Sequence, residues 1–193
     1  LNPSAGSDGV TDMLVVNGDL LLATHGSGVM RFDISNSQWK SAWDTQNHLP
    51  SDYVNQLLEA NGVLMIAMDD AGIARQSVST SSWLATWTDA NWLASNVVRS
   101  MAVSADWLHI LLDDTLHHYN ITMGAFTSSK SLTNLGLPLD GLDLLPWPAG
   151  GARSPSVDTV LVSDGSGQMA RIVSANPPLH SGSALFASGP HSN

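Results

Sequence analysis

The 193-residue chain contains no cysteine. This absence excludes disulfide bonds, zinc–thiolate sites and thiol nucleophiles. It does not identify a compartment, because many secreted prokaryotic proteins also lack cysteine. A chain of this length can bury a core that needs no crosslinks, so we expect one folded domain.

Basic residues and long apolar runs are also scarce. Seven Lys and Arg stand against 17 Asp and Glu, which gives a formal net charge of −10. A phosphate backbone would meet a repulsive field, so we expect no nucleic-acid partner. No apolar run approaches the roughly 20 residues that a bilayer requires, so we expect no membrane insertion by this segment. The chain begins with Leu1 and shows no signal-peptide pattern, and we expect a fragment of a longer protein.

A repeat dominates what the sequence does contain. Residues 49–78 carry three short apolar runs separated by turns at Asn61-Gly62 and at 69–72. Moving the pattern by about 44 positions, a spacing typical of a propeller blade, places it on 93–121 and on 7–34. A fourth copy begins at Leu137 and resumes at 159–173 after a Pro- and Gly-rich insert. The four copies predict four equivalent structural units.

Each copy contains four short strands bounded by Gly, Asn, Asp or Ser. The strands expected in the first two copies are 11–16, 20–24, 29–34, 38–44, 54–59, 63–68, 73–78 and 83–87. The third copy adds 98–103, 107–112, 116–121 and a strand near Phe126, and a closing strand is expected at 184–187. The runs are too short and too often interrupted for a helical repeat.

Four copies of a four-stranded antiparallel unit predict an all-β fold, a β-propeller. A single copy would leave sheet faces exposed that only stacking on the next copy can bury. We expect a single domain over 1–193 with blades at 7–48, 49–92, 93–136 and 137–188, and a tail at 189–193.

The motif LPSDYVNQLLEANGVLMIAMDDAGIARQ, which begins at Leu49, resembles the repeat of two-component-regulator propellers. Blades of that family read L-P-S-x-x-V, then a Gly turn, an apolar strand and a Gly-Leu/Ile-x-Arg strand. Ile73-Ala74-Arg75 and the run from Val29 to Asp33 match the last element. The second strands depart from the family's Trp-Ile-Gly-Thr, so these blades are divergent. The resemblance implies a sensing or recognition role without chemistry, within a larger array.

The two ends of the chain do not show how the ring of blades closes. The first copy starts with its first strand and the last ends with its fourth, so no swapped strand closes the ring. There are three alternatives: a tight four-bladed ring, a fragment of a longer propeller, and a symmetric dimer that forms an eight-bladed ring. We favour a homodimer or larger symmetric assembly, because complete blades with bare ends invite pairing.

Turns at one rim of a propeller face a common funnel. We expect the ligand-binding residues of this rim to be His25, Asp69, Asp70, Asp113, Asp114 and Asp164. Asp in a tight turn is also selected for backbone conformation and local hydrogen bonds, which is the structural alternative. An acidic rim could attract Ca²⁺, a cationic ligand or a sugar. We expect no obligatory cofactor and retain Ca²⁺ as a candidate, since it needs six to eight converging oxygens.

First-strand residues are expected to line the central channel. Matching positions of the four copies hold Thr11, Asn55, Arg99 and Asp143. An Arg99–Asp143 pair could clamp a polar ligand or simply satisfy itself across a narrow pore. The tryptophans at 39, 43, 83 and 87 are expected to pack between blades rather than to stack on sugars, and the adjacent His117 and His118 point to opposite faces and cannot chelate one ion.

Motifs of enzymes are missing. The chain has no G-x-S-x-G elbow, phosphate loop, H-E-x-x-H or dinucleotide fingerprint. Adjacent turn carboxylates, as at Asp69-Asp70, are not the opposed pair that glycoside hydrolysis needs. We expect no catalytic residues and a non-catalytic recognition domain that binds a small ligand, glycan or protein at its rim, in an extracellular, periplasmic or cell-surface protein. A self-assembling half-propeller and a carbohydrate-active propeller enzyme are the alternatives.

Overall fold

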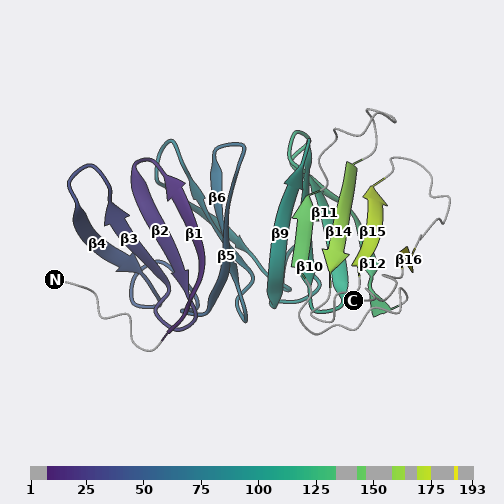
Figure 1. Ribbon diagram of the computed structural model, residues 1–193, viewed down its shortest axis with the longest axis horizontal. Coiled ribbons are helices and arrows are strands. Elements are labelled where there is room, and N and C mark those ends of the chain that lie inside the picture. Colours follow the sequence, from purple (N-terminus) through teal and green to yellow (C-terminus); the bar gives the residue numbers. More distant parts are fainter. Residues whose placement is uncertain (1–7, 134–142, 147–157, 164–168, 175–184, 187–193) are drawn as a thin grey trace, which may run out of the picture. The chain divides into compact units, whose positions relative to one another are not determined.

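The computed structural model describes residues 8–133, 143–146, 158–163, 169–174 and 185–186. Its regular elements in these ranges are β-strands, β1 to β16, arranged in four-stranded antiparallel sheets (Figure 1). The chain forms two compact units, unit 1 (Leu1–Arg99) and unit 2 (Ser100–Asn193), each with two sheets. Whether the chain is one domain over 1–193 stays a prediction. Within the described ranges no helix is long and apolar enough to span a membrane.

Unit 1 holds the first two predicted blades. Its first sheet contains β1 (Val10–Val16), β2 (Asp19–Thr24), β3 (Val29–Asp33) and β4 (Gln38–Trp43) in that order. Its second sheet contains β5 (Val54–Ala60), β6 (Val63–Met68), β7 (Ile73–Ser77) and β8 (Trp83–Trp87). Each predicted strand is present with ends shifted by one residue at most, because the turn residues that bound the strands are strong local signals.

Unit 2 holds the other two sheets. The third sheet contains β9 (Val98–Ser104, whose first two residues belong to unit 1), β10 (Trp107–Leu112), β11 (Thr115–Asn120) and β12 (Ala125–Ser131). The fourth contains β13 (Asp143–Pro146), β14 (Asp158–Ser163), β15 (Met169–Ser174) and β16 (Leu185–Phe186). The same meander order in all four sheets confirms the predicted fold class.

The repeat extends to individual backbone conformations. Asn17, Asn61 and Ala105 occupy matching hairpin corners between first and second strands, and their φ angles are 51°, 51° and 49°. A left-handed conformation suits Asn, and Asn-Gly is the preferred pair of a two-residue hairpin turn. Ala105 adopts the same conformation without that preference, so the fold imposes the corner there.

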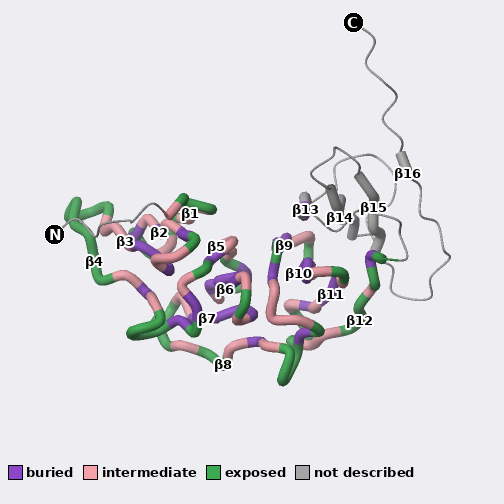
Figure 2. The backbone as a smooth tube through the Cα atoms, turned by 90° about the horizontal axis from the view of Figure 1, so that it is seen from below, coloured by how far each residue is buried: buried purple, intermediate pink, exposed green. Residues whose placement is uncertain are grey.

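The core of unit 1 lies between its two sheets. Leu21, Val54, Leu64, Ile66 and Met68 are at most 3% exposed and belong to one apolar cluster. In Figure 2 the buried positions of unit 1 gather along the inner strands of its two sheets, and β4 is mostly exposed. Burial of each such side chain contributes about 1.5–3 kcal/mol, so stacking of the two sheets stabilises them both.

Candidate functional site

Predicted rim and channel residues of unit 1 meet at one carboxylate, that of Asp69. The Nδ2 atom of Asn55 lies 3.3 Å from its Oδ1, and the Nη1 atom of Arg99 lies 3.5 Å from the same oxygen. The Nε2 atom of His25 lies 3.9 Å from Oδ2. The expected rim and channel sets are therefore not separate here, because three repeats contribute to one group of side chains.

Tyr53 fixes the two rim residues of this group. Asp69 directly follows β6, and its backbone N–H donates to the Tyr53 carbonyl at 3.0 Å. His25 directly follows β2 and forms an isolated antiparallel bridge with Tyr53. The two rings meet edge to face, with centroids 4.9 Å apart. We call His25, Tyr53, Asn55, Asp69 and Arg99 the Asp69 cluster.

The Asp69 cluster is a surface feature that contributes little to stability. The side chains of His25, Asp69 and Arg99 are 48%, 36% and 44% exposed. Ion pairs at this exposure are worth about 0–1 kcal/mol. The cluster therefore presents one carboxylate, one guanidinium, an imidazole and a phenol ring to an incoming ligand.

The remaining predicted rim residues are Asp70, Asp113, Asp114 and Asp164. Asp70 is exposed beside Asp69. In unit 2, Asp114 accepts a hydrogen bond from the Thr115 hydroxyl at 2.8 Å, which is the local role expected of a turn Asp. Asp113 is half-buried. Asp164 lies outside the described residues. Within the described ranges, no three His, Asp or Glu side chains are placed to hold a metal ion.

Two of the predicted channel residues join neighbouring first strands. The hydroxyl of Thr11 donates to the Val54 carbonyl at 2.7 Å, and the amide of Asn55 donates to the Val98 carbonyl at 2.9 Å. These bonds repeat with the blade spacing, so they are structural links. Arg99 contacts Asp69, as described above. Asp143 begins β13, but its side chain lies outside the described features, and the Arg99–Asp143 pair stays a prediction.

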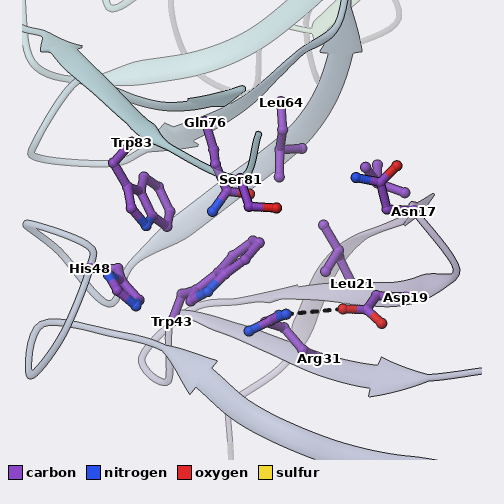
Figure 3. A pocket seen from close by; sticks show the side chains of 11 residues that line it. Asn17, Asp19, Leu21, Arg31, Trp43, His48, Leu64, Gln76, Ser81 and Trp83 are labelled. Atoms are coloured by element: carbon purple, nitrogen blue, oxygen red, sulfur yellow. Dashed lines mark hydrogen bonds and ion pairs between the residues drawn. The ribbon is translucent and has the colours of Figure 1, made fainter. Parts of the chain in front are cut away.

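A pocket that the sequence analysis did not identify lies between the two sheets of unit 1 (Figure 3). It has a volume of about 300 Å³, at the lower end of the range for ligand sites. The first sheet and the loop after it contribute Val16, Asn17, Asp19, Leu21, Arg31, Trp43 and His48, and the second sheet and its last turn contribute Leu64, Gln76, Ser81 and Trp83. We call this the inter-sheet pocket.

An ion network forms one wall of the inter-sheet pocket. Asp19 is 8% exposed and accepts from Arg31 Nη2 at 3.0 Å and from Lys40 Nζ at 2.5 Å. Lys40 also contacts Asp33 at 3.2 Å. The hydrogen bond to Asp19 raises the pKa of Lys40. Hydrogen bonds from Ser35 and then from the Asn36 backbone lower the pKa of Asp33. The two carboxylates and two cations balance in charge.

Aromatic rings form a second wall, which adjoins the ion network. Trp43 and Trp83 meet edge to face at 82° with centroids 5.2 Å apart, and His48 stacks on Trp83 at 5.3 Å. The guanidinium of Arg31 lies 4.3 Å from the centre of the Trp43 ring, and Arg75 repeats this contact on Trp87 at 4.2 Å. The repeated Arg–Trp contact is a feature of the blades. Trp43 and Trp83 pack between the sheets, as predicted, whereas Trp39 is 36% exposed and packs against Phe32 of its own sheet.

Departures from the repeat are the signal that could have revealed this pocket. Asp19 corresponds to Val63 in the second copy and to Trp107 in the third, and Lys40 corresponds to Leu84. A carboxylate at a position that is apolar in the other copies is costly to bury unless it is paired. Nothing in one copy alone shows that its partner is Arg31, because that pairing depends on the register of β2 and β3.

Unit 2 contains a second unusual group, a pair of buried histidines. The Nδ1 atoms of His109 and His118 lie 2.9 Å apart, and the two residues are 0% and 1% exposed. Burial lowers the pKa of His109 to about 4, and burial followed by the charge of His109 lowers that of His118 to about 3. His117 lies on the other face of β11, beside Phe126, and burial lowers its pKa as well. As predicted, His117 and His118 do not converge on one ion.

No family model matches the chain, and no curated protein sequence matches it. Solved structures resemble it in fold. The computationally designed protein Ika4 is 12% identical, with a TM-score of 0.60, and the match covers 88% of this chain and 93% of that protein. The WD40 repeats of RRP9 are 11% identical, with a TM-score of 0.62 and coverages of 86% and 48%.

An extracellular domain assigned to a hybrid two-component system of B. thetaiotaomicron, BT3049, is 17% identical, with a TM-score of 0.59. The match covers 84% of this chain but only 23% of that one. At this sequence identity, the resemblance to sensor propellers shows a shared fold and does not show a shared function. WD40 repeats form β-propeller blades. The chain is an all-β protein of the β-propeller class.

Proposed function

We propose that this chain is a non-catalytic recognition domain of a larger extracellular or surface protein, and that the Asp69 cluster is its binding site for a small ligand, a glycan or a protein. The observation that carries the proposal is the convergence of side chains from three repeats on one carboxylate that remains 36% exposed. Such a cluster adds little to stability, so its convergence is better explained by a ligand.

The geometry of the cluster favours binding over catalysis. At 3.9 Å the His25–Asp69 contact is too long for the hydrogen bond that orients a general base. Asp69 and Asp70 are neighbours in a turn and do not face each other across a substrate. A carboxylate next to a guanidinium and a phenol ring suits a partner that carries both hydrogen-bond donors and acceptors.

Loss of the Asp69 carboxylate is expected to weaken recognition without unfolding the domain. On an array of glycans and peptides, read with and without Ca²⁺, the parent chain should give defined signals. Asp69→Asn and Arg99→Gln should each weaken these signals at least about tenfold, the equivalent of one charged hydrogen bond. The thermal midpoint should stay within about 2 °C of the parent value, because the contacts are exposed.

Asp89→Asn is the matched control, since Asp89 is also exposed in a loop of unit 1 but lies outside the cluster. It should leave the array signals unchanged. Signals that survive both Asp69→Asn and Arg99→Gln would place recognition elsewhere and overturn the proposal.

A second candidate function, self-association, is favoured by one exposed strand face. Met13 of β1 is 63% exposed, and Val15, two residues further on the same face, is 60% exposed. The residues that correspond to Met13 in the next two copies, Leu57 and Met101, are 3% and 1% exposed. Leu57 is covered because β1 packs against β5, where the Leu57 N–H donates to Asp12 at 2.8 Å.

We therefore propose that the β1 face is the surface on which a second copy of this chain docks, continuing the contact that β1 makes with β5. The proposal corresponds to the head-to-tail ring that the sequence favours. In this reading the exposed Met13 and Val15 belong to a repeated interface, since an isolated apolar patch would favour aggregation.

Met13→Asp is expected to convert a dimer into a monomer. Light scattering should give a mass of two chains for the parent and of one chain for the variant, because a buried unpaired carboxylate opposes the contact. Met123→Asp is the control, since Met123 is 71% exposed in the turn between β11 and β12. A parent mass of one chain at every concentration would rule out the second copy.

A further inference from the structure

Gln76 is a largely buried residue whose carboxamide faces the inter-sheet pocket. It is 8% exposed, and its carboxamide makes no hydrogen bond to any residue in the described ranges. At the corresponding positions of the first and third sheets aromatic rings pack instead: Phe32 against Trp39, and Tyr119 against Phe126. No atom of this carboxamide is among the buried polar atoms that lack a partner, so the group is open to the pocket and can bond a ligand that enters it.

The carboxamide lies where a ligand could reach it. Gln76 is the central residue of a row across the second sheet, between its register partners Leu64 and Trp83. All three line the inter-sheet pocket, and Figure 3 shows the Gln76 side chain beside that of Ser81, above the Trp43 ring. The Ser81 hydroxyl also makes no hydrogen bond within the described residues. Two unused polar groups therefore adjoin one cavity of about 300 Å³.

We propose that the inter-sheet pocket binds an uncharged, polyhydroxylated ring, that is, a monosaccharide or a terminal sugar residue. This site is separate from the Asp69 cluster, because Asp19 and Leu64 lie at or near the first residues of β2 and β6 whereas His25 and Asp69 follow their last residues. The proposal does not depend on the function assigned to that cluster.

Charge balance selects an uncharged ligand. The buried carboxylate of Asp19 already accepts from both Arg31 and Lys40. A charged ligand would have to displace one of these partners and leave a buried charge unpaired, which is costly. A wholly apolar ligand is equally disfavoured, because it would bury Gln76 and Ser81 without hydrogen bonds.

The hydrogen-bonding capacity of Gln76 and Ser81 and the shape of the aromatic wall favour a ligand with hydroxyl groups on a puckered ring. A carboxamide offers two donors and an acceptor, and a serine hydroxyl offers one donor and an acceptor. Neighbouring hydroxyls, which both donate and accept, match this combination. Trp43 and Trp83 form a corner of 82°, and His48 and Arg31 each cover a ring face. Such a corner suits the C–H face of a sugar better than a flat base, which prefers a parallel slot.

The test follows the indole N–H signals of the ¹⁵N-labelled full chain during titration with single compounds at millimolar concentrations. The neutral probes are glucose, galactose, mannose and N-acetylglucosamine, the charged probes are glucuronate and glucosamine, and adenosine is the flat probe. We expect at least one neutral sugar to shift the Trp83 signal, assigned with Trp83→Phe. We expect Gln76→Leu to weaken that sugar about three- to tenfold, the loss of one or more neutral hydrogen bonds.

Two controls separate loss of binding from loss of structure. Gln38→Leu, at an exposed position of β4, should bind like the parent. Gln76→Leu should unfold at the same or a higher urea concentration, because an apolar side chain of similar size replaces a carboxamide that forms no hydrogen bond within the described residues. The proposal is overturned if no neutral sugar shifts the Trp83 signal, if only adenosine or a charged sugar does, or if Gln76→Leu binds as tightly as the parent.

Discussion

Replacement of Gly72 by alanine is expected to lower the free energy of unfolding by about 3 kcal/mol or more. Gly72 has a φ of +78°, and a Cβ atom added there would lie 2.0 Å from the Trp87 carbonyl oxygen. The strain therefore has two sources, a left-handed conformation and a collision with backbone that cannot rotate away. Urea unfolding should show a lower midpoint with the same dependence on denaturant.

Gly62→Ala is the matched control for this experiment. Gly62 has a similar φ of +74°, but no heavy atom lies within 4 Å of its added Cβ. It should cost only about 1 kcal/mol, from conformation alone. Gly28 repeats the geometry of Gly72, with its Cβ 2.1 Å from the Trp43 carbonyl, and should repeat its effect. Equal losses in Gly72→Ala and Gly62→Ala would contradict the close approach of Trp87.

Acidification from about pH 7.5 to about pH 5 is expected to destabilise unit 2 by about 2 kcal/mol for each of His109 and His118. Both folded pKa values, about 4 and about 3, lie below the ordinary value of 6.5. The unfolded chain therefore binds more protons than the folded chain between these values. The contribution of the two neutral histidines to stability is fully present above about pH 6.5 and is lost as the pH falls towards their folded pKa values.

Geometry supports the same direction. The two Nδ1 atoms share one hydrogen bond of 2.9 Å, in which one ring must accept and so must be neutral. The double variant His109→Leu, His118→Leu removes both partners together and should make urea-derived stability nearly independent of pH over this range. The exposed His25→Gln is the control and should retain the parent slope. A parent protein with no loss of stability at about pH 5 would refute the prediction.

Local signals made the fold largely readable from the sequence. The Asn17-Gly18 and Asn61-Gly62 turns ended strands at predictable points, and the apolar run at 63–68 coincides with β6. The repeat then assigned the same order to the degenerate third copy, where Ala105 replaces Asn at the corner. Turn residues and the alternation of apolar and polar residues act over a few neighbouring positions, so they can be recognised in the sequence alone.

The candidate sites could be predicted only in part from the sequence. His25, Asn55, Asp69 and Arg99 were selected by their repeat positions, but rim and channel were expected to be separate groups. The order of strands brings them to one carboxylate, because the end of β6 lies beside the start of β5 and close to Val98 at the start of β9. The inter-sheet pocket was missed, because its polar residues are far apart in the chain and their pairing depends on the register of the strands.

The sequence alone determined the repeating four-stranded unit, its turns and the class of fold, since these depend on periodicity and on the conformations that Asn and Gly allow. The tertiary structure decided which charges pair and which polar groups remain unpaired, as at Asp19 and Gln76. The physical reason is that a hydrogen bond depends on distances of about 3 Å between atoms of different strands. Only the packing of one sheet on another sets those distances.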